Sequence, residues 1–260
     1  QAPGETRKKA CPDTRHRHPI LSLNAASVNI HGLGLFSKGS AKVEQLLTFW
    51  TEHKLHLLFI QEVFIENNLA EAARRKLEQI FNAKAFLDLP AQSRQGCIIL
   101  LHDSLQGHFA KEARNGRCAA IRLQLSQSFD LVCASIYAPV TGCSRKHLES
   151  FWGKCSKILR NVSRSGEGAP PTLYLIGSDL NARLSSLDSR SGKGEEPVDS
   201  PIRNFITDFR LIDTFRHLNP DTYSPSFVSK SSTGESRIAA ILSSPFLSLY
   251  CTTCTITDSL

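Results

Sequence analysis

The chain has 260 residues, 41% of them hydrophobic and 21% charged, which is the balance of an ordinary globular protein large enough to bury a core. No apolar run approaches the roughly 20 residues that a membrane span needs, so a membrane-spanning protein is excluded and no membrane partner is expected. Lys and Arg number 31 against 24 Asp and Glu, and the resulting charge of +7 favours a polyanionic partner such as nucleic acid.

Residues 1–18 are polar and basic and predict a flexible arm, whereas residues 19–260 show no repeat or internal linker and predict one domain. The arm has no apolar signal-peptide core. Several of the eight cysteines sit in apolar strands or on helix faces, as buried free thiols do. We therefore expect a reducing, intracellular compartment, nuclear or cytoplasmic. The chain contains no Met and begins at Gln1, so we expect a segment of a longer polypeptide.

Helix and strand patterns interleave along the rest of the chain. Apolar residues at spacings of three and four predict helices, with Ser40 as the cap of the first, and short continuous apolar runs predict buried strands. Several strands follow one another through short loops, which favours mixed sheets with helices outside. In chain order we expect a strand at 20–30, helices at 42–53 and 69–81 with a strand at 55–60 between them, strands at 96–101, 117–125 and 131–137, a helix at 147–160, a strand at 173–176, an exposed loop at 189–200, a helix at 201–218, a strand at 236–242 and a β-prone run at 247–257.

Polar residues follow the predicted strands at their ends. Asn29 ends the first strand, Glu62 follows the second, and Tyr137 ends a third. Asp179 and Asn181 leave the 173–176 strand two residues apart, so on an extended backbone their side chains would point the same way. The alternative for this pair is an Asx-type turn that closes the strand. Carboxylate oxygens with amides suit Mg²⁺ and a phosphate ester.

Five short motifs follow one another along the chain, and the first four contain these residues. The motifs are Val28-Asn29-Ile30-His31-Gly32, Ile60-Gln61-Glu62, Ile136-Tyr137-Ala138-Pro139, Gly177-Ser178-Asp179-Leu180-Asn181 and Ser236-Arg237-Ile238. Their order and spacing resemble those of the endonuclease/exonuclease/phosphatase superfamily and, more narrowly, the apurinic-like endonuclease domain of LINE-type (non-LTR) retrotransposons. The resemblance covers about residues 20–260.

The resemblance implies a four-layer αββα sandwich, with two mixed β-sheets flanked by helices and the active site at one end. It implies Mg²⁺, with Mn²⁺ as the alternative, held by Glu62 with help from Asn29. Tyr137 would contact the scissile phosphate, Asp179 would orient or deprotonate the attacking water, and Asn181 would support both. The implied reaction nicks DNA and leaves a 3′-hydroxyl that primes reverse transcription, so the implied partners are DNA and a reverse transcriptase region of the same polyprotein.

The chain departs from the family pattern in two places. Relatives follow Ser-Arg-Ile with Asp, where this chain has Ala239. Relatives also end in a Ser-Asp-His box, which is either decayed here to Asp258-Ser259 or lies beyond Leu260, and we favour the second interpretation. We therefore expect a chain with impaired catalysis. A non-catalytic nucleic-acid-binding domain of the same fold is the alternative, and an inositol-phosphate or sphingomyelin hydrolase is a third interpretation.

Five basic residues are candidates for contacts with DNA. Charged loop residues are often simply solvated, and His31 sits equally well on a surface or in the cleft, so both interpretations stay open. The candidates are His31, Arg183, Arg190, Lys193 and Arg237.

Overall fold

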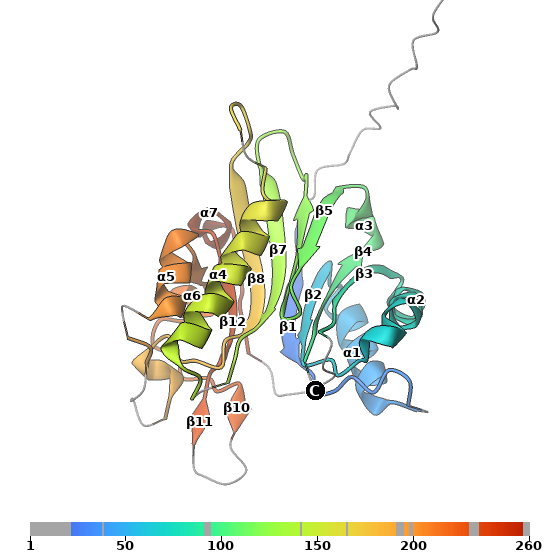
Figure 1. Ribbon diagram of the computed structural model, residues 1–260, viewed down its shortest axis with the longest axis horizontal. Helices are drawn as coiled ribbons and strands as arrows, with labels where there is room; N and C mark the ends of the chain where they lie inside the picture. Colours follow the sequence, from blue (N-terminus) through green and yellow to red (C-terminus); the bar gives the residue numbers. More distant parts are fainter. Residues whose placement is uncertain are drawn as a thin grey trace, which may run out of the picture.

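Two β-sheets lie face to face, and helices cover their outer faces (Figure 1). The computed structural model describes residues 22–37, 39–90, 95–140, 142–164, 166–190, 195–197, 200–228 and 234–256, so the predicted arm lies outside the described residues. The arrangement confirms the four-layer sandwich with two mixed sheets.

The first sheet has four strands in the order β1-β2-β4-β3. β1 (Ala25–Asn29) and β2 (Leu57–Gln61) are parallel, whereas β4 (Cys97–His102) runs antiparallel to both β2 and β3 (Ala83–Asp88). On its outer face, α1 (Ala41–Glu52) and α2 (Ala70–Phe81) bury the apolar residues that the helical spacing predicted, among them Leu46, Trp50, Leu77 and Phe81. The short helices η1 (Asn67–Leu69) and α3 (Asp103–Gln106) connect these elements.

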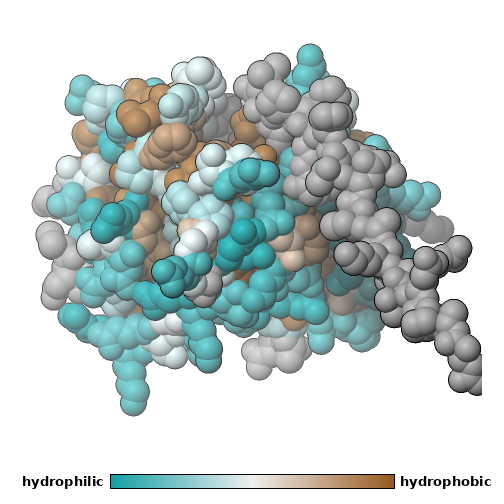
Figure 2. Space-filling model, turned by 90° about the horizontal axis from the view of Figure 1, so that it is seen from above, coloured by the Kyte–Doolittle hydropathy of each residue, from teal (hydrophilic) through white to brown (hydrophobic). Residues whose placement is uncertain are grey.

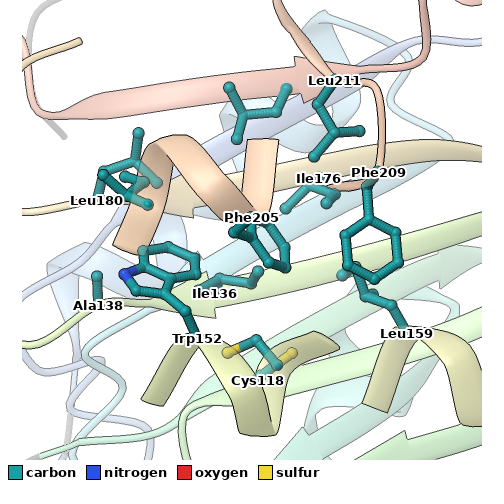
Figure 3. Close-up of a cluster of buried hydrophobic side chains, with 14 of the residues drawn as sticks. Cys118, Ile136, Ala138, Trp152, Leu159, Ile176, Leu180, Phe205, Phe209 and Leu211 are labelled. Carbon is teal, nitrogen blue, oxygen red and sulfur yellow. The ribbon is translucent and has the colours of Figure 1, made fainter. Parts of the chain in front are cut away.

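The second sheet has six strands in the order β5-β6-β7-β8-β12-β9. β7 and β8 are parallel and the other neighbours antiparallel. Trp152 and Phe205 of the covering helices, and Phe209 directly after the second of these helices, pack against its outer face (Figure 3). The strands are β5 (Phe109–Arg114), β6 (Cys118–Leu123), β7 (Asp130–Tyr137), β8 (Thr172–Asp179), β9 (Ile212–Asp213) and β12 (Ala239–Ser243), and the helices nearby are α4 (Arg145–Val162), η2 (Ser186–Asp188), α5 (Pro201–Asp208), α6 (Thr214–Leu218) and α7 (Pro245–Leu249).

The two sheets lie in close contact at Gly177 of β8. A Cβ built there would lie 2.4 Å from the ring of Phe59 on β2, so only a glycine leaves room for this ring. Phe59 is fully buried in an inter-sheet core with Ile99, Ile121 and Cys133. The close contact sets the distance between the sheets next to the end of β8, where Asp179 lies.

The sequence-based boundaries are wrong in the last quarter of the chain. The single helix expected at 201–218 is divided into α5 and α6, because Arg210 takes a left-handed φ of 49° and β9 then pairs with β12. The β-prone run at 247–257 begins instead within α7, which has Pro245 at its first position. The strand at 236–242 is two strands, β12 and the shorter β11 (Glu235–Ser236), which pairs with β10 (Phe227–Val228).

Ser40 does precede α1, but its side chain makes no cap bond to the helix and instead donates to the Leu33 carbonyl. None of the described helices is long and apolar enough to cross a membrane. The end of the molecule opposite the C-terminal ends of β1, β2, β7 and β8 is mostly hydrophilic, and hydrophobic residues show on it in several separate places (Figure 2).

Candidate active site

The C-terminal ends of β1, β2, β7 and β8 lie at one end of the sandwich, the lower end in Figure 1. β1 and β2 are parallel, so Asn29 lies opposite Gln61 and next to Glu62. β7 and β8 are also parallel, and Tyr137 pairs with Asp179. Four strand ends thus deliver Asn29, Glu62, Tyr137 and Asp179 to one edge of the two sheets.

The side-chain amide of Asn29 joins the two carboxylates. Its Nδ2 donates to Glu62 Oε1 at 2.9 Å and to Asp179 Oδ2 at 2.6 Å. The Oδ1 atom of Asn29 accepts the backbone N–H of His31 at 3.0 Å, which fixes the orientation of the amide. In this state Asn29 bridges two acids from opposite sheets as a hydrogen-bond donor.

Glu62 is held as an anion. Its partial burial works to raise its pKa, but hydrogen bonds from Asn29, Tyr137 and His31 outweigh burial and leave the pKa below its usual value. His31 Nδ1 lies 2.9 Å from Glu62 Oε2 while its ring is exposed to solvent. Glu62 is therefore charged at neutral pH and reaches the surface of the site.

The pKa values of Asp179 and Tyr137 are shifted in the opposite direction, above their usual values. Burial raises the pKa of Asp179, the hydrogen bonds from Asn29 and the Asn181 amide lower it, and the charge of Glu62 raises it, with a net increase. Burial and the hydrogen bond to Glu62 also raise the pKa of the Tyr137 phenol, so it stays protonated as a donor. Two neighbouring carboxyl groups whose pKa values move apart are typical of acid–base sites.

Asp179 and Asn181 form the Asx-type turn that was the alternative for this pair. The backbone N–H of Asn181 donates to Asp179 Oδ1 at 2.9 Å, and Asn181 takes a left-handed φ of 49°. The side chain of Asn181 donates to the Ala138 carbonyl at 2.9 Å. The prediction of two parallel side chains is therefore wrong for Asn181, since the chain is no longer extended there.

Several non-glycine residues at this end of the fold have a left-handed backbone conformation. His31, Glu62, Phe64 and Asn181 all have positive φ, between 44° and 55°. Such values are uncommon outside glycine and cost free energy that the surroundings must supply. At Glu62 and Asn181 the positive φ turns the chain out of the strand, and the Glu62 side chain accepts from Asn29 while the Asn181 side chain donates to the Ala138 carbonyl.

The acidic pair fits a hard divalent cation. Among the described residues no group of three or more His, Cys, Asp or Glu side chains is placed to hold a metal ion. Mg²⁺ needs no such cage, because it keeps several waters and binds through one or two carboxylates and substrate phosphates. An ionised Glu62 beside Asp179 meets that requirement. Asn29 offers its amide N–H groups to both acids, so it would position the ligands.

Ala239 lies directly beside the acidic pair. It is the first residue of β12 and pairs with Asp179 across the antiparallel β8–β12 ladder. The neighbouring Leu180 N–H donates to the Ile238 carbonyl at 2.8 Å, which closes the ladder. A carboxylate at position 239 would therefore enter the same edge as Glu62 and Asp179, where the chain now has a methyl group.

The basic candidates for DNA contacts differ in placement. His31 and Arg190 are exposed, Arg183 is partly exposed, and Lys193 lies outside the described residues. The predicted DNA contact of Arg237 is wrong, because this residue is only 3% exposed and its guanidinium pairs with Asp188 and Asp213. The ion pairs with Asp188 and Asp213 hold the Arg237 side chain inside the fold, so it cannot reach DNA.

Sequence reasoning missed three residues that support the site. Gln61 is buried, and its amide donates to Ser135 Oγ at 3.0 Å on the opposite sheet. Lys42 donates to the carbonyls of Ile30 and His31 and so holds the strained turn. Arg117 lies 5.0 Å from the ring centre of Tyr137. Of these three residues, only Gln61 could have been found from the sequence, because it is a polar residue at the end of a predicted buried strand.

Known proteins resemble this chain in part of their sequence and in fold. No known family model matches the chain. The Xenopus laevis protein described as "Transposon TX1 uncharacterized 149 kDa protein" is 25% identical over 211 residues, which cover 80% of this chain and 15% of that relative. The chain thus spans about a seventh of the length of this relative.

Two solved structures share the fold. The AP endonuclease LMAP from Leishmania major has a TM-score of 0.66 at 16% identity and covers 88% of this chain and 80% of its own. An AP endonuclease from Archaeoglobus fulgidus has a TM-score of 0.64 at 14% identity, and the match covers 90% of this chain and 91% of that protein's chain. The fold implied by the resemblance to the endonuclease/exonuclease/phosphatase superfamily is confirmed, and the transposon relative agrees with its LINE-type branch.

Proposed function

We propose that this chain, which has the fold of AP endonucleases, is a DNA endonuclease domain that hydrolyses phosphodiester bonds and whose catalysis is impaired at position 239. The observation that carries the proposal is the Asn29 amide, which joins Glu62 and Asp179 from two different sheets. Two acids with divergent pKa values, a protonated phenol and a net charge of +7 suit a reaction at a phosphodiester.

Each side chain has a role that follows from its surroundings. Asp179, with its raised pKa, accepts a proton from the attacking water more readily than an ordinary carboxylate does. Tyr137 keeps its proton and donates to the phosphate oxygen or to Glu62. Glu62 would hold Mg²⁺, with Mn²⁺ as the alternative, and the bound cation would neutralise charge on the phosphate oxygens. Asn29 holds the two carboxylates in position relative to each other through its hydrogen bonds.

The transposon relative supports the biological setting of the proposal. It is a 149 kDa protein of a transposon, and this chain resembles a small part of it. A nick that leaves a 3′-hydroxyl provides the primer that a LINE-type element needs for reverse transcription. The partners would then be target DNA and a reverse transcriptase region of the same longer polypeptide.

Position 239 favours a second function. With Ala239 beside Asp179, the site lacks the carboxylate that the resemblance to the superfamily implies at this position. A chain that keeps the fold and the basic charge without the full set of acids would bind nucleic acid and not cut it. This non-catalytic DNA-binding domain is the alternative to the impaired endonuclease.

A nicking assay on supercoiled plasmid with Mg²⁺ tests the proposal. We expect slow relaxation by the chain as it is, and an increase of about tenfold or more with Ala239→Asp, because charge stabilisation at a phosphoryl site is worth several kcal/mol. Glu62→Ala should abolish the activity of both forms. Product ends that polymerase extends without treatment would show the 3′-hydroxyl.

The same assay separates the two functions. A variant with Ala239→Asp, extended by a Ser-Asp-His segment after Leu260, should nick faster than either change alone if the domain is an endonuclease. Persistent inactivity of this extended variant with retained DNA binding would support the non-catalytic alternative. Relaxation at an ordinary nuclease rate by the unmodified chain would contradict the predicted impairment.

A further inference from the structure

Lys42 contacts the turn that carries Asn29 and His31 into the candidate active site. It is the second residue of α1, and its side chain reaches back to the turn that follows β1. Its Nζ donates to the Ile30 carbonyl at 2.7 Å and to the His31 carbonyl at 2.8 Å. The helix that covers the first sheet is thereby connected to the site through one ammonium group.

A single peptide group joins Lys42 to Asn29. The carbonyl of Ile30 and the N–H of His31 belong to the same planar peptide bond. Lys42 Nζ donates to the oxygen of this group, and Asn29 Oδ1 accepts its N–H at 3.0 Å. A cation on the oxygen polarises the peptide group and makes its N–H a stronger donor. The orientation of the Asn29 amide therefore depends on Lys42.

The orientation of this amide decides how it meets the two acids. With Oδ1 on the His31 N–H, Nδ2 is left to donate to Glu62 at 2.9 Å and to Asp179 at 2.6 Å. Rotation of the amide by half a turn would place its oxygen against two carboxylates and its NH₂ against an N–H donor, and both contacts would be repulsive. The peptide group that Lys42 holds thus selects the orientation in which Asn29 joins the acids.

The same turn also reaches Glu62 without Asn29. His31 Nδ1 lies 2.9 Å from Glu62 Oε2, and the N–H of Gly32 donates to the Glu62 carbonyl at 2.7 Å. His31 and Glu62 have left-handed φ values of 44° and 55°. Such a backbone persists only where its neighbours support it. Lys42 supports the His31 side of this contact through the His31 carbonyl.

We propose that Lys42 is a positioning residue, which acts through the Ile30–His31 peptide group to hold the Asn29 amide and the Glu62 carboxylate in the arrangement that binds a divalent cation. Its role is indirect, because its Nζ contacts backbone carbonyls and neither of the two acids. The inference rests on the proposed function, since it makes cation binding depend on a residue outside the predicted site.

Charge and position predict opposite effects when the Lys42 ammonium group is removed. A positive charge near a cation site repels the cation, so its removal alone would strengthen cation binding. Loss of a hydrogen-bond partner that orients a metal ligand weakens metal affinity by about 10- to 100-fold. Weaker cation binding by an uncharged Lys42 variant would therefore report on position and not on charge.

Binding of Mn²⁺ to the whole chain, followed by electron paramagnetic resonance of the free ion, tests the inference without DNA. We expect the unmodified chain to bind Mn²⁺ and Glu62→Ala to abolish this binding. Lys42→Met keeps the length of the side chain but removes its donors, and it should weaken Mn²⁺ binding about tenfold. Lys42→Arg keeps the charge and several N–H donors, and it should retain most of the affinity.

Lys157→Met provides the matched control, because Lys157 is exposed on α4, which covers the other sheet. It should leave the Mn²⁺ affinity unchanged. Lys42 is only partly buried, so Lys42→Met should fold, and thermal unfolding followed by circular dichroism checks this. Lys42→Gln, whose donor lies one bond closer to the backbone, is a second variant for which we expect the same loss of affinity.

Unchanged or tighter Mn²⁺ binding by the folded Lys42→Met and Lys42→Gln variants, with binding that still depends on Glu62, would overturn this inference alone. A lower unfolding temperature with unchanged Mn²⁺ affinity would have the same consequence, because it would assign Lys42 to the stability of the fold. A lack of Glu62-dependent Mn²⁺ binding by the unmodified chain would overturn the cation site of the proposed function together with this inference.

Discussion

Arg237 stands at the centre of a balanced group of buried charges, with Asp188 and Asp213 as its anionic partners and Arg216 as the second cation. Its side chain is 2% exposed, and its pKa is raised, because the two carboxylates outweigh the effect of burial. A guanidinium suits this place since it donates to both carboxylates at once. The cluster links the η2 turn, the start of α6 and the segment that precedes β12 to one another.

Replacing Arg237 by Ala should cost about 3–5 kcal/mol of unfolding free energy, because two buried carboxylates lose their shared partner. Urea denaturation followed by circular dichroism measures this cost. Arg190→Ala is the control, since an exposed pair contributes about 1 kcal/mol at most. Equal stability of the two variants would mean that the Arg237 cluster is not a structural element of the fold.

The comparison of Asp179 with Arg237 shows what the sequence predicts at single residues. Asp179 follows a continuous apolar run, and such a run fixes both burial and the end of the strand, so its place in the site was predictable. Arg237 follows no such run. Whether an arginine faces solvent or a buried acid depends on Asp188 and Asp213, which lie 49 and 24 residues away. That information is tertiary, so the local pattern could not supply it.

At the scale of elements, long periodic segments were predictable and short ones were not. The amphipathic α4 and the buried β2 and β7 lie close to their expected positions. β3 and β5 were missed, although β3 is mostly buried, because their polar and apolar residues follow no simple period. The region after Pro201 was misread because β9 is two residues long and exists only through its pairing with β12.

The contact between β2 and β8 makes a prediction at this scale. Gly177→Ala should lower the unfolding free energy by roughly 2 kcal/mol or more, because the new methyl group overlaps Phe59 in a packed core. Gly153→Ala is the matched control: Gly153 lies in α4 with nothing within 4 Å of its added Cβ, so alanine should stabilise the helix by about 0.5–1 kcal/mol.

Thermal unfolding of both variants measures the two effects with opposite signs. Phe59→Leu should restore part of the stability that Gly177→Ala removes, since it shortens the side chain that is in the way. If Gly177→Ala were as stable as the unmodified chain, the two sheets would not be held at the distance that this structure shows.

At the scale of the whole molecule, the sandwich explains why residues far apart in the chain share one site. Asn29 and Asp179 are 150 residues apart, yet both end strands that run toward the same edge. The inter-sheet core beneath them is built mainly from apolar residues, and Gln61 and Ser135 bond across it. The site is therefore placed by two rigid sheets, and the loops around it are left to contact the ligand.

The net charge gives the last prediction, which concerns residues 1–18. Removing them takes away five basic and two acidic residues and lowers the formal net charge from +7 to +4. If the arm contacts DNA, the slope of log K against log salt should become shallower by about 0.9 for each phosphate contact that is lost. Anisotropy with a paired duplex over a range of NaCl concentrations measures this slope. The shortened chain keeps β1, which begins at Ala25, and should unfold at the same temperature. An unchanged slope would place all the phosphate contacts on residues 19–260, whereas replacing Arg7, Lys8 and Lys9 by Gln should reproduce part of the deletion if the basic side chains act through charge alone.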